Sequence, residues 1–88
     1  MRVPIVVPQL GAAAETVRVN GWFVEAGDRI VEGDLLVELL ITGITFDLAA
    51  EVSGVIIEIS QPLGGEVRSG NVLGWMKPAI SDLEDSIN

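Results

Sequence analysis

The feature that most constrains the fold is an internal repeat. The pattern of glycines and apolar residues that begins at Gly27 recurs 37 residues later, from Gly64. Each copy has two glycines six residues apart, an apolar residue between them, and an apolar run after the second glycine. Neither copy could bury its own apolar face, so the repeat predicts two similar half-sheets that cover each other. The matched positions are Gly27, Ile30, Gly33 and Leu36 in the first copy and Gly64, Val67, Gly70 and Leu73 in the second.

Short apolar runs between turn residues indicate an all-β chain. Ten glycines and four prolines interrupt the sequence so often that helical apolar periodicity is not sustained. Short strands at this spacing are typical of a sandwich or barrel. The expected strands are residues 3–7, 17–19, 22–24, 35–41, 44–48, 55–59 and 72–75, with Asn20 and Gly21 between the second and the third.

The clearest local prediction is a hairpin over residues 35–48 that turns at Thr42 and Gly43. Glycine supplies the positive φ that a two-residue turn needs, at no steric cost. A slip of one residue would mix the two faces, so the apolar pattern fixes the register. In that register Ile41 faces Ile44, Leu39 faces Phe46 and Val37 faces Leu48. The other face carries Leu40 and Thr45 and one unfavourable like-charge pair, Glu38 opposite Asp47.

Composition excludes several kinds of function. The chain has no Cys and no His, which removes disulfides, thiolate nucleophiles, Cys-based zinc sites and the commonest general base. Five Lys and Arg against thirteen Asp and Glu give a net charge of −8, which argues against nucleic acid and anionic membranes. No apolar run approaches the ~20 residues of a membrane helix, and the N-terminus is a poor signal peptide, so we expect a cytoplasmic, non-catalytic protein without a metal.

Four further residues receive structural interpretations. Trp22 and Trp75 are expected to pack in the core or at its rim rather than to bind sugars, and Asp28 and Asp34 to stabilise turns through their side-chain oxygens.

Lys77 and Pro78 end the apolar pattern and are expected to follow the last strand. We therefore predict one domain over residues 1–77 and an acidic tail, or the start of a linker, over residues 78–88.

Several short motifs follow one another in a fixed order from Pro8 to Leu73. Their order and spacing resemble the lipoyl domains of 2-oxo acid dehydrogenase acyltransferase components, and more broadly the biotinyl/lipoyl attachment family. The resemblance implies a flattened barrel-sandwich hybrid of two roughly four-stranded antiparallel sheets with pseudo two-fold symmetry. The motifs are Pro8-Gln9-Leu10-Gly11, Trp22 twelve residues after Leu10, Gly27-Asp28-Arg29-Ile30, Val52-Ser53-Gly54-Val55, and the series Gly64, Val67, Gly70 and Leu73.

The resemblance also implies a lysine at the tip of the central hairpin, where the family carries its lipoyl group. Counting from Gly27 or from Gly54 places that lysine at Gly43, and the chain's single lysine is Lys77. Two further departures are Ala12-Ala13, where the family has Glu-Ser, and Val17, where it has glycine. We therefore expect neither lipoate nor biotin on this chain, and no other cofactor.

The expected function is that of a binding or structural module related to these carrier domains, with a protein partner such as a 2-oxo acid dehydrogenase-type complex. Ile41 and Ile44, with Thr42 and Gly43 between them, either bind that partner or only extend the apolar face of the hairpin. A non-carrier domain could dock to such a complex or to a lipoyl ligase. The alternative is a lysine-free adaptor that packs against other subunits, as in efflux membrane-fusion proteins, although a long helical insertion usually splits those and residues 35–48 are continuous.

Overall fold

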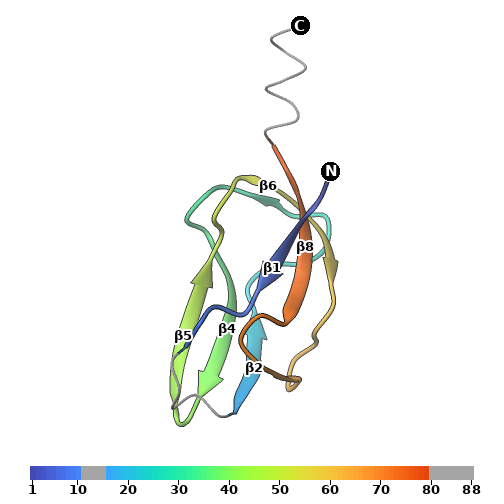
Figure 1. Ribbon diagram of the computed structural model, residues 1–88. Coiled ribbons are helices and arrows are strands. Elements are labelled where there is room, and N and C mark those ends of the chain that lie inside the picture. The colour runs from blue at the N-terminus through green and yellow to red at the C-terminus, as the bar shows by residue number, and fades with distance from the viewer. Residues whose placement is uncertain (11–15, 80–88) are drawn as a thin grey trace, which may run out of the picture.

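Two four-stranded antiparallel sheets enclose the core between them (Figure 1). The structure is a computed structural model that describes residues 1–10 and 16–79. Sheet A has the strand order β1-β8-β6-β3 and sheet B the order β5-β4-β2-β7, which confirms the predicted all-β fold class. The strands are β1 (Val3–Val6), β2 (Val17–Trp22), β3 (Arg29–Ile30), β4 (Leu35–Ile41), β5 (Ile44–Ala49), β6 (Gly54–Ile59), β7 (Glu66–Val67) and β8 (Val72–Pro78).

The repeat seen in the sequence is a repeat of strands. The bounds of β2, β3 and β4, shifted by 37 residues, are those of β6, β7 and β8. The irregularity in the β2–β4 pairing between Val19 and Gly21 recurs in the β6–β8 pairing between Ile56 and Glu58. The edge strands β1 and β5 complete the correspondence between the two sheets. The two halves are thus built alike down to their bulges.

Glycines with positive φ form the turns on either side of the short strands β3 and β7. Gly27, Gly33, Gly64 and Gly70 have φ between 84° and 99°, as the third residue of a type II turn requires. In three of these turns, the side chain of the fourth residue accepts a hydrogen bond from the backbone N–H of the first residue. The Val31 N–H donates to Asp34 Oδ2 at 2.8 Å, and the Arg68 N–H donates to the matching Asn71 Oδ1 at 2.9 Å. The Glu25 N–H donates to Asp28 Oδ2 at 2.8 Å, so the turn roles predicted for Asp28 and Asp34 are confirmed.

Both halves contribute matching residues to one core. The matched pairs are buried on both sides: Val19 with Ile56, Ile30 with Val67, Leu36 with Leu73, and Leu39 with Met76. Trp22 packs against this core, and its indole N–H donates to the Gln61 carbonyl oxygen at 2.7 Å. Its predicted packing role is therefore confirmed. Each half-sheet covers the apolar face of the other, as the repeat predicts.

The structure differs from the sequence-based expectation in three places. Residues 17–22 form one strand with a bulge at Gly21, rather than two strands around a turn, because β4 pairs with both parts. The two-residue strands β3 and β7 were not predicted. Lys77 does not follow the last strand but lies inside β8, where it pairs with Val55. Most of the predicted tail, residues 80–88, lies outside the described residues, and the domain boundary stays a prediction. The described part of the chain has no helix with the length and hydropathy to cross a membrane.

The matched turns generate a prediction about stability. Asp34→Ala and Asn71→Ala each remove the side-chain acceptor of a turn N–H, so each should lower the free energy of unfolding by about 1 kcal/mol in urea titrations. Asn71→Ala makes this deletion without a change of charge. Glu32→Ala, in the same turn as Asp34 but without this side-chain bond, is the control, and an equal loss in Glu32→Ala would contradict the role given to Asp34.

The close approach of β6 and β8 generates a second prediction. A Cβ at the buried Gly54 would overlap the backbone carbonyl oxygen of Lys77, which no rotamer change can relieve. Gly54→Ala should therefore lower the free energy of unfolding by about 2 kcal/mol or more. A Cβ at Gly21 would meet nothing within 4 Å. Gly21→Ala should leave stability unchanged or raise it by up to about 1 kcal/mol, and equal effects at the two positions would refute this explanation.

Candidate functional site

The hairpin of β4 and β5 has the register predicted from the sequence. Ile41 pairs with Ile44 across a turn of two residues, Thr42 and Gly43, and the remaining pairs follow as expected down to Val37 with Leu48. Thr42 has φ 44° and Gly43 has φ 84°. Positive φ at both central residues is the geometry of a type I′ turn, whose twist matches that of the flanking strands. We call Ile41, Thr42, Gly43 and Ile44 the hairpin tip.

Thr42 holds an unusual backbone conformation. It is the one residue other than glycine, among those the structure describes, with a positive φ. A β-branched side chain is disfavoured there, whereas Asn and Asp tolerate it. Sequence reasoning assigned the positive φ to Gly43 and missed Thr42. The signal was present, because a two-residue turn of this type needs positive φ at both central positions.

The residues of the hairpin tip differ in what they contact. A Cβ at Gly43 would meet nothing within 4 Å, so the bend is open on its outer side. Ile44 is 67% exposed. Ile41 is half-buried and packs against the core. The tip thus presents one apolar side chain, Ile44, to solvent, while its partner across the turn belongs to the packing of the domain.

The core covers the β4 side of the hairpin's apolar face better than the β5 side, because β5 is the edge strand of sheet B. Leu39 is fully buried, whereas Phe46 opposite it is 40% exposed. The predicted like-charge pair of Glu38 and Asp47 is present on the other face. Glu38 accepts a hydrogen bond from the Asn20 side-chain amide, which partly offsets the unfavourable pairing.

Lys77 lies far from the hairpin tip. It is exposed near the end of β8, and β8 leads to the end of the molecule where both termini emerge, opposite the β4–β5 bend (Figure 1). Ala12 and Ala13, which the family resemblance marks as departures, lie outside the described residues.

A shallow groove of about 190 Å³ runs between the edge strands β1 and β5. Glu51 is the one charged residue among those that line it. Among the described residues no three His, Cys, Asp or Glu side chains gather where they could hold a metal ion. The groove and the hairpin tip both present apolar surface that a ligand or partner could cover. The apolar lining residues are Val3, Pro4, Ile5, Val6, Leu36, Leu48, Ala49, Val52 and Met76.

Comparison with known proteins agrees with this geometry. The chain is 32% identical over 81 residues to the dihydrolipoyllysine-residue succinyltransferase component of the 2-oxoglutarate dehydrogenase complex of Rickettsia conorii, covering 92% of this chain and 20% of that protein. The equivalent component of Bacillus subtilis is 31% identical over 78 residues, covering 89% of this chain and 19% of that protein. The chain therefore spans about a fifth of the length of these relatives.

A solved structure and a family model extend the comparison. The lipoyl domain of the 2-oxoglutarate dehydrogenase complex from Azotobacter vinelandii matches with a TM-score of 0.72 and 27% identity, over 85% of this chain and 95% of that one. The biotin/lipoyl family model, described as biotin-requiring enzyme, matches residues 3–76. The chain thus belongs to the biotin/lipoyl attachment family, as a lipoyl-domain-type module related to the acyltransferase components of 2-oxo acid dehydrogenase complexes.

Proposed function

We propose that this lipoyl-domain-type module is not itself lipoylated or biotinylated and acts by binding a protein partner. The observation that carries the proposal is the bend of the β4–β5 hairpin, which consists of Thr42 and Gly43 and has no amine. Attachment of lipoate or biotin forms an amide, and amide formation needs a primary amine that the ligase can reach. Gly43 occupies the open position of the bend and has no side chain to acylate.

The single lysine does not replace the missing group. Lys77 is held in β8, paired with Val55 on the neighbouring strand, rather than on a protruding turn. A ligase that recognises a lysine at the end of a hairpin would meet a sheet surface there. This placement supports a module without a carrier role.

The partner proposed for the module is a 2-oxo acid dehydrogenase-type complex. The support is that the relatives named above are components of such complexes. The contact proposed for it is the hairpin tip, with Ile44 as the apolar side chain that becomes buried. The connection between β4 and β5 disfavours the adaptor alternative, because only two residues join these strands and leave no place for a helical insertion.

A third prediction concerns the attachment of lipoate by a ligase. Incubation with a lipoyl ligase, ATP and lipoate should leave the mass of the chain unchanged. The double variant Thr42→Asp/Gly43→Lys should gain one lipoyl group, because it places an amine on the open bend. The lysine takes up a positive φ at an expense of about 1 kcal/mol, while the Asp is better suited than Thr42 to its own positive φ. Intact-mass spectrometry after the reaction measures both outcomes.

Leu63→Asp/Gly64→Lys is the matched control. Gly64 has the same φ of 84° and equally open surroundings, but it lies on another turn, so this variant should stay unmodified. A mass gain by the parent chain would overturn the proposal. A folded Thr42→Asp/Gly43→Lys variant that is not modified would show that determinants away from the bend are also lost.

A fourth prediction concerns the binding of the partner. Ile44→Ser should weaken binding to the purified components of a 2-oxoglutarate dehydrogenase complex about tenfold, because burial of an isoleucine side chain contributes roughly 1.5 kcal/mol or more. Titration calorimetry measures the dissociation constant. Ile57→Ser, at an exposed isoleucine of β6 in the other sheet, is the control. Equal affinities for the parent and Ile44→Ser would reject the hairpin tip as the contact.

A further inference from the structure

Three of the chain's five cationic side chains lie in one row across sheet A. Arg29 of β3 pairs with Val55 of β6, and Val55 pairs with Lys77 of β8. Val3 of β1 pairs with Met76, so the preceding residue, Arg2, lies beside Lys77. We call Arg2, Lys77 and Arg29 the cationic row. Such a cluster of positive charge is unexpected in a chain whose net charge is −8.

The cationic row lies on the outer face of the sheet. Ile30 follows Arg29 and Met76 precedes Lys77, and both are buried in the core, as is Ile56 beside the intervening Val55. The alternation of a strand therefore turns the row outward. Arg29 and Lys77 are exposed. Within the described part of the chain, the only side-chain ion pairs are Arg2 with Glu58 and Arg18 with Glu66. Two of the three charges in the row are thus unneutralised by any described carboxylate.

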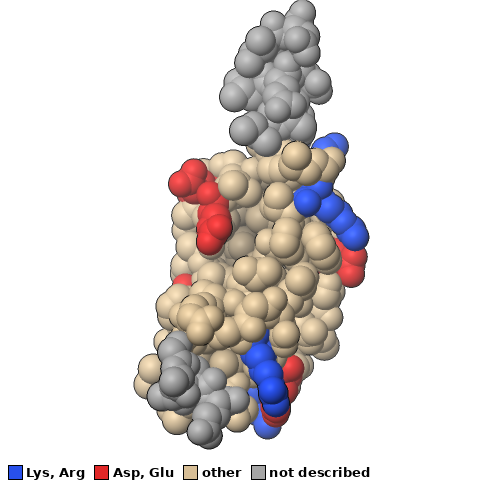
Figure 2. Space-filling view, in the orientation of Figure 1, with Lys and Arg blue, Asp and Glu red and all other residues tan. Residues whose placement is uncertain are grey.

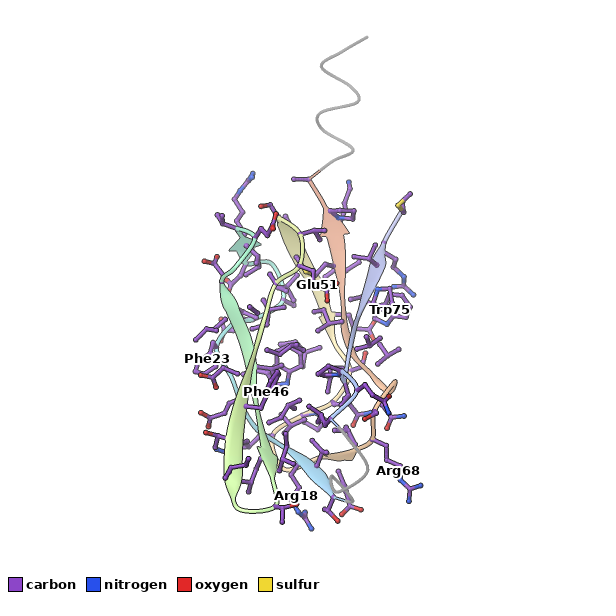
Figure 3. The ribbon with its side chains drawn as sticks, turned by 60° about the vertical axis from the view of Figure 1, so that its left-hand side comes forward. Arg18, Phe23, Phe46, Glu51, Arg68 and Trp75 are labelled. Carbon is purple, nitrogen blue, oxygen red and sulfur yellow. The ribbon has the colours of Figure 1, made fainter. Side chains whose placement is uncertain are left out.

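Trp75 fixes the position of Arg2. The Arg2 guanidinium carbon lies 4.5 Å from the centroid of the Trp75 ring, a cation–π contact, and Arg2 Nη1 lies 3.9 Å from Glu58 Oε1. Positive side chains are seen together near the end of the molecule that carries the termini, with an acidic group just below them (Figure 2). Trp75 lies on the side of the molecule formed by β1 and β8 (Figure 3), and the Arg2 guanidinium covers one face of its ring.

The pseudo-symmetry provides an internal comparison. A shift of 37 residues maps the β8, β6 and β3 positions of the row onto Leu40, Arg18 and Glu66, which are aligned in the same way across sheet B. That row has one cation, and Arg18 Nη2 lies 3.4 Å from Glu66 Oε2. The same backbone therefore folds without three cations. Arg2 and Lys77 lie on neighbouring strands, and Val55 of β6 separates Lys77 from Arg29.

We infer that the outer face of sheet A, along the cationic row, binds an acidic peptide segment of a partner protein. The row crosses three strand intervals, roughly 15 Å, which is about the length of five extended residues. Its charge complements Asp and Glu side chains, and Val55, which separates Lys77 from Arg29 along the row, offers apolar contact between them. Long nucleic acids fit less well, because their phosphates would extend past the row towards a strongly acidic remainder. This inference does not depend on the hairpin tip.

The test uses a fluorescently labelled peptide of alternating glutamate and serine, and a matched peptide with glutamine for glutamate. Fluorescence anisotropy at low salt should show that the full chain binds the acidic peptide more tightly than it binds the glutamine peptide. Arg29→Gln and Lys77→Gln should each weaken binding about two- to fivefold, and together about tenfold, as expected for exposed ion pairs. Salt near 150 mM should weaken binding further in the parent chain.

Arg68→Gln is the matched control for charge. Arg68 is exposed, has no described ion pair, and lies away from Trp75 toward the opposite end of the molecule (Figure 3). It should change the affinity less than twofold, and circular dichroism should show all variants folded. Equal effects of Arg68→Gln and Lys77→Gln, or equal affinity for the glutamine peptide, would overturn the inference.

Two further outcomes would assign the face to another ligand. Tighter binding of a single-stranded oligonucleotide with the same charge as the peptide would overturn the choice of a peptide. The variant Asp82→Asn/Glu84→Gln/Asp85→Asn removes the acids of the chain's own C-terminal segment. If only this variant bound the peptide, the chain's own acidic segment would be the occupant, and a partner would be excluded.

Discussion

The mutual covering of two half-sheets is the constraint on which the structure depends. Each half has one apolar face, and a strand pair or single small sheet cannot shield such a face from water. The residues that meet in the core are matched copies, such as Leu36 and Leu73 or Val19 and Ile56. The turns that carry Gly33 and Gly70 return the chain at equivalent points, so both halves reach the core in the same register. Loss of this correspondence would expose both faces at once.

The parts of the fold that were predictable from the sequence are those with a local signal. The hairpin register follows from the alternation of apolar residues and a glycine at the bend. The strands β3 and β7 are too short to have a period, and only their pairing with β6 and β2 defines them. Asn20 and Gly21 have the composition of a turn, yet pairing with β4 keeps them in one strand with a bulge. The cationic row joins residues from both ends and the middle of the chain, so strand register alone brings it together.

The hairpin bend of this module forms from Thr42 and Gly43, without a lysine. A bend with two positive φ values, an open outer side and a well-packed hairpin below it needs no amine to form. Thr42 adopts its unfavourable conformation because both common two-residue hairpin turns, types I′ and II′, need a positive φ at the first central residue. Under the proposed function, the same hairpin packing presents Ile44 to a partner instead of positioning a carrier lysine.

The position of the chain ends has a consequence for how the module can be used. The first and last described strands, β1 and β8, pair in sheet A as β5 and β4 pair in sheet B. The hairpin bend joins β4 to β5, whereas no such bend joins β1 to β8. The bend of β4 and β5 lies at the far pole (Figure 1). A partner that covers the bend would therefore approach from the pole opposite to the one at which β1 begins and β8 ends.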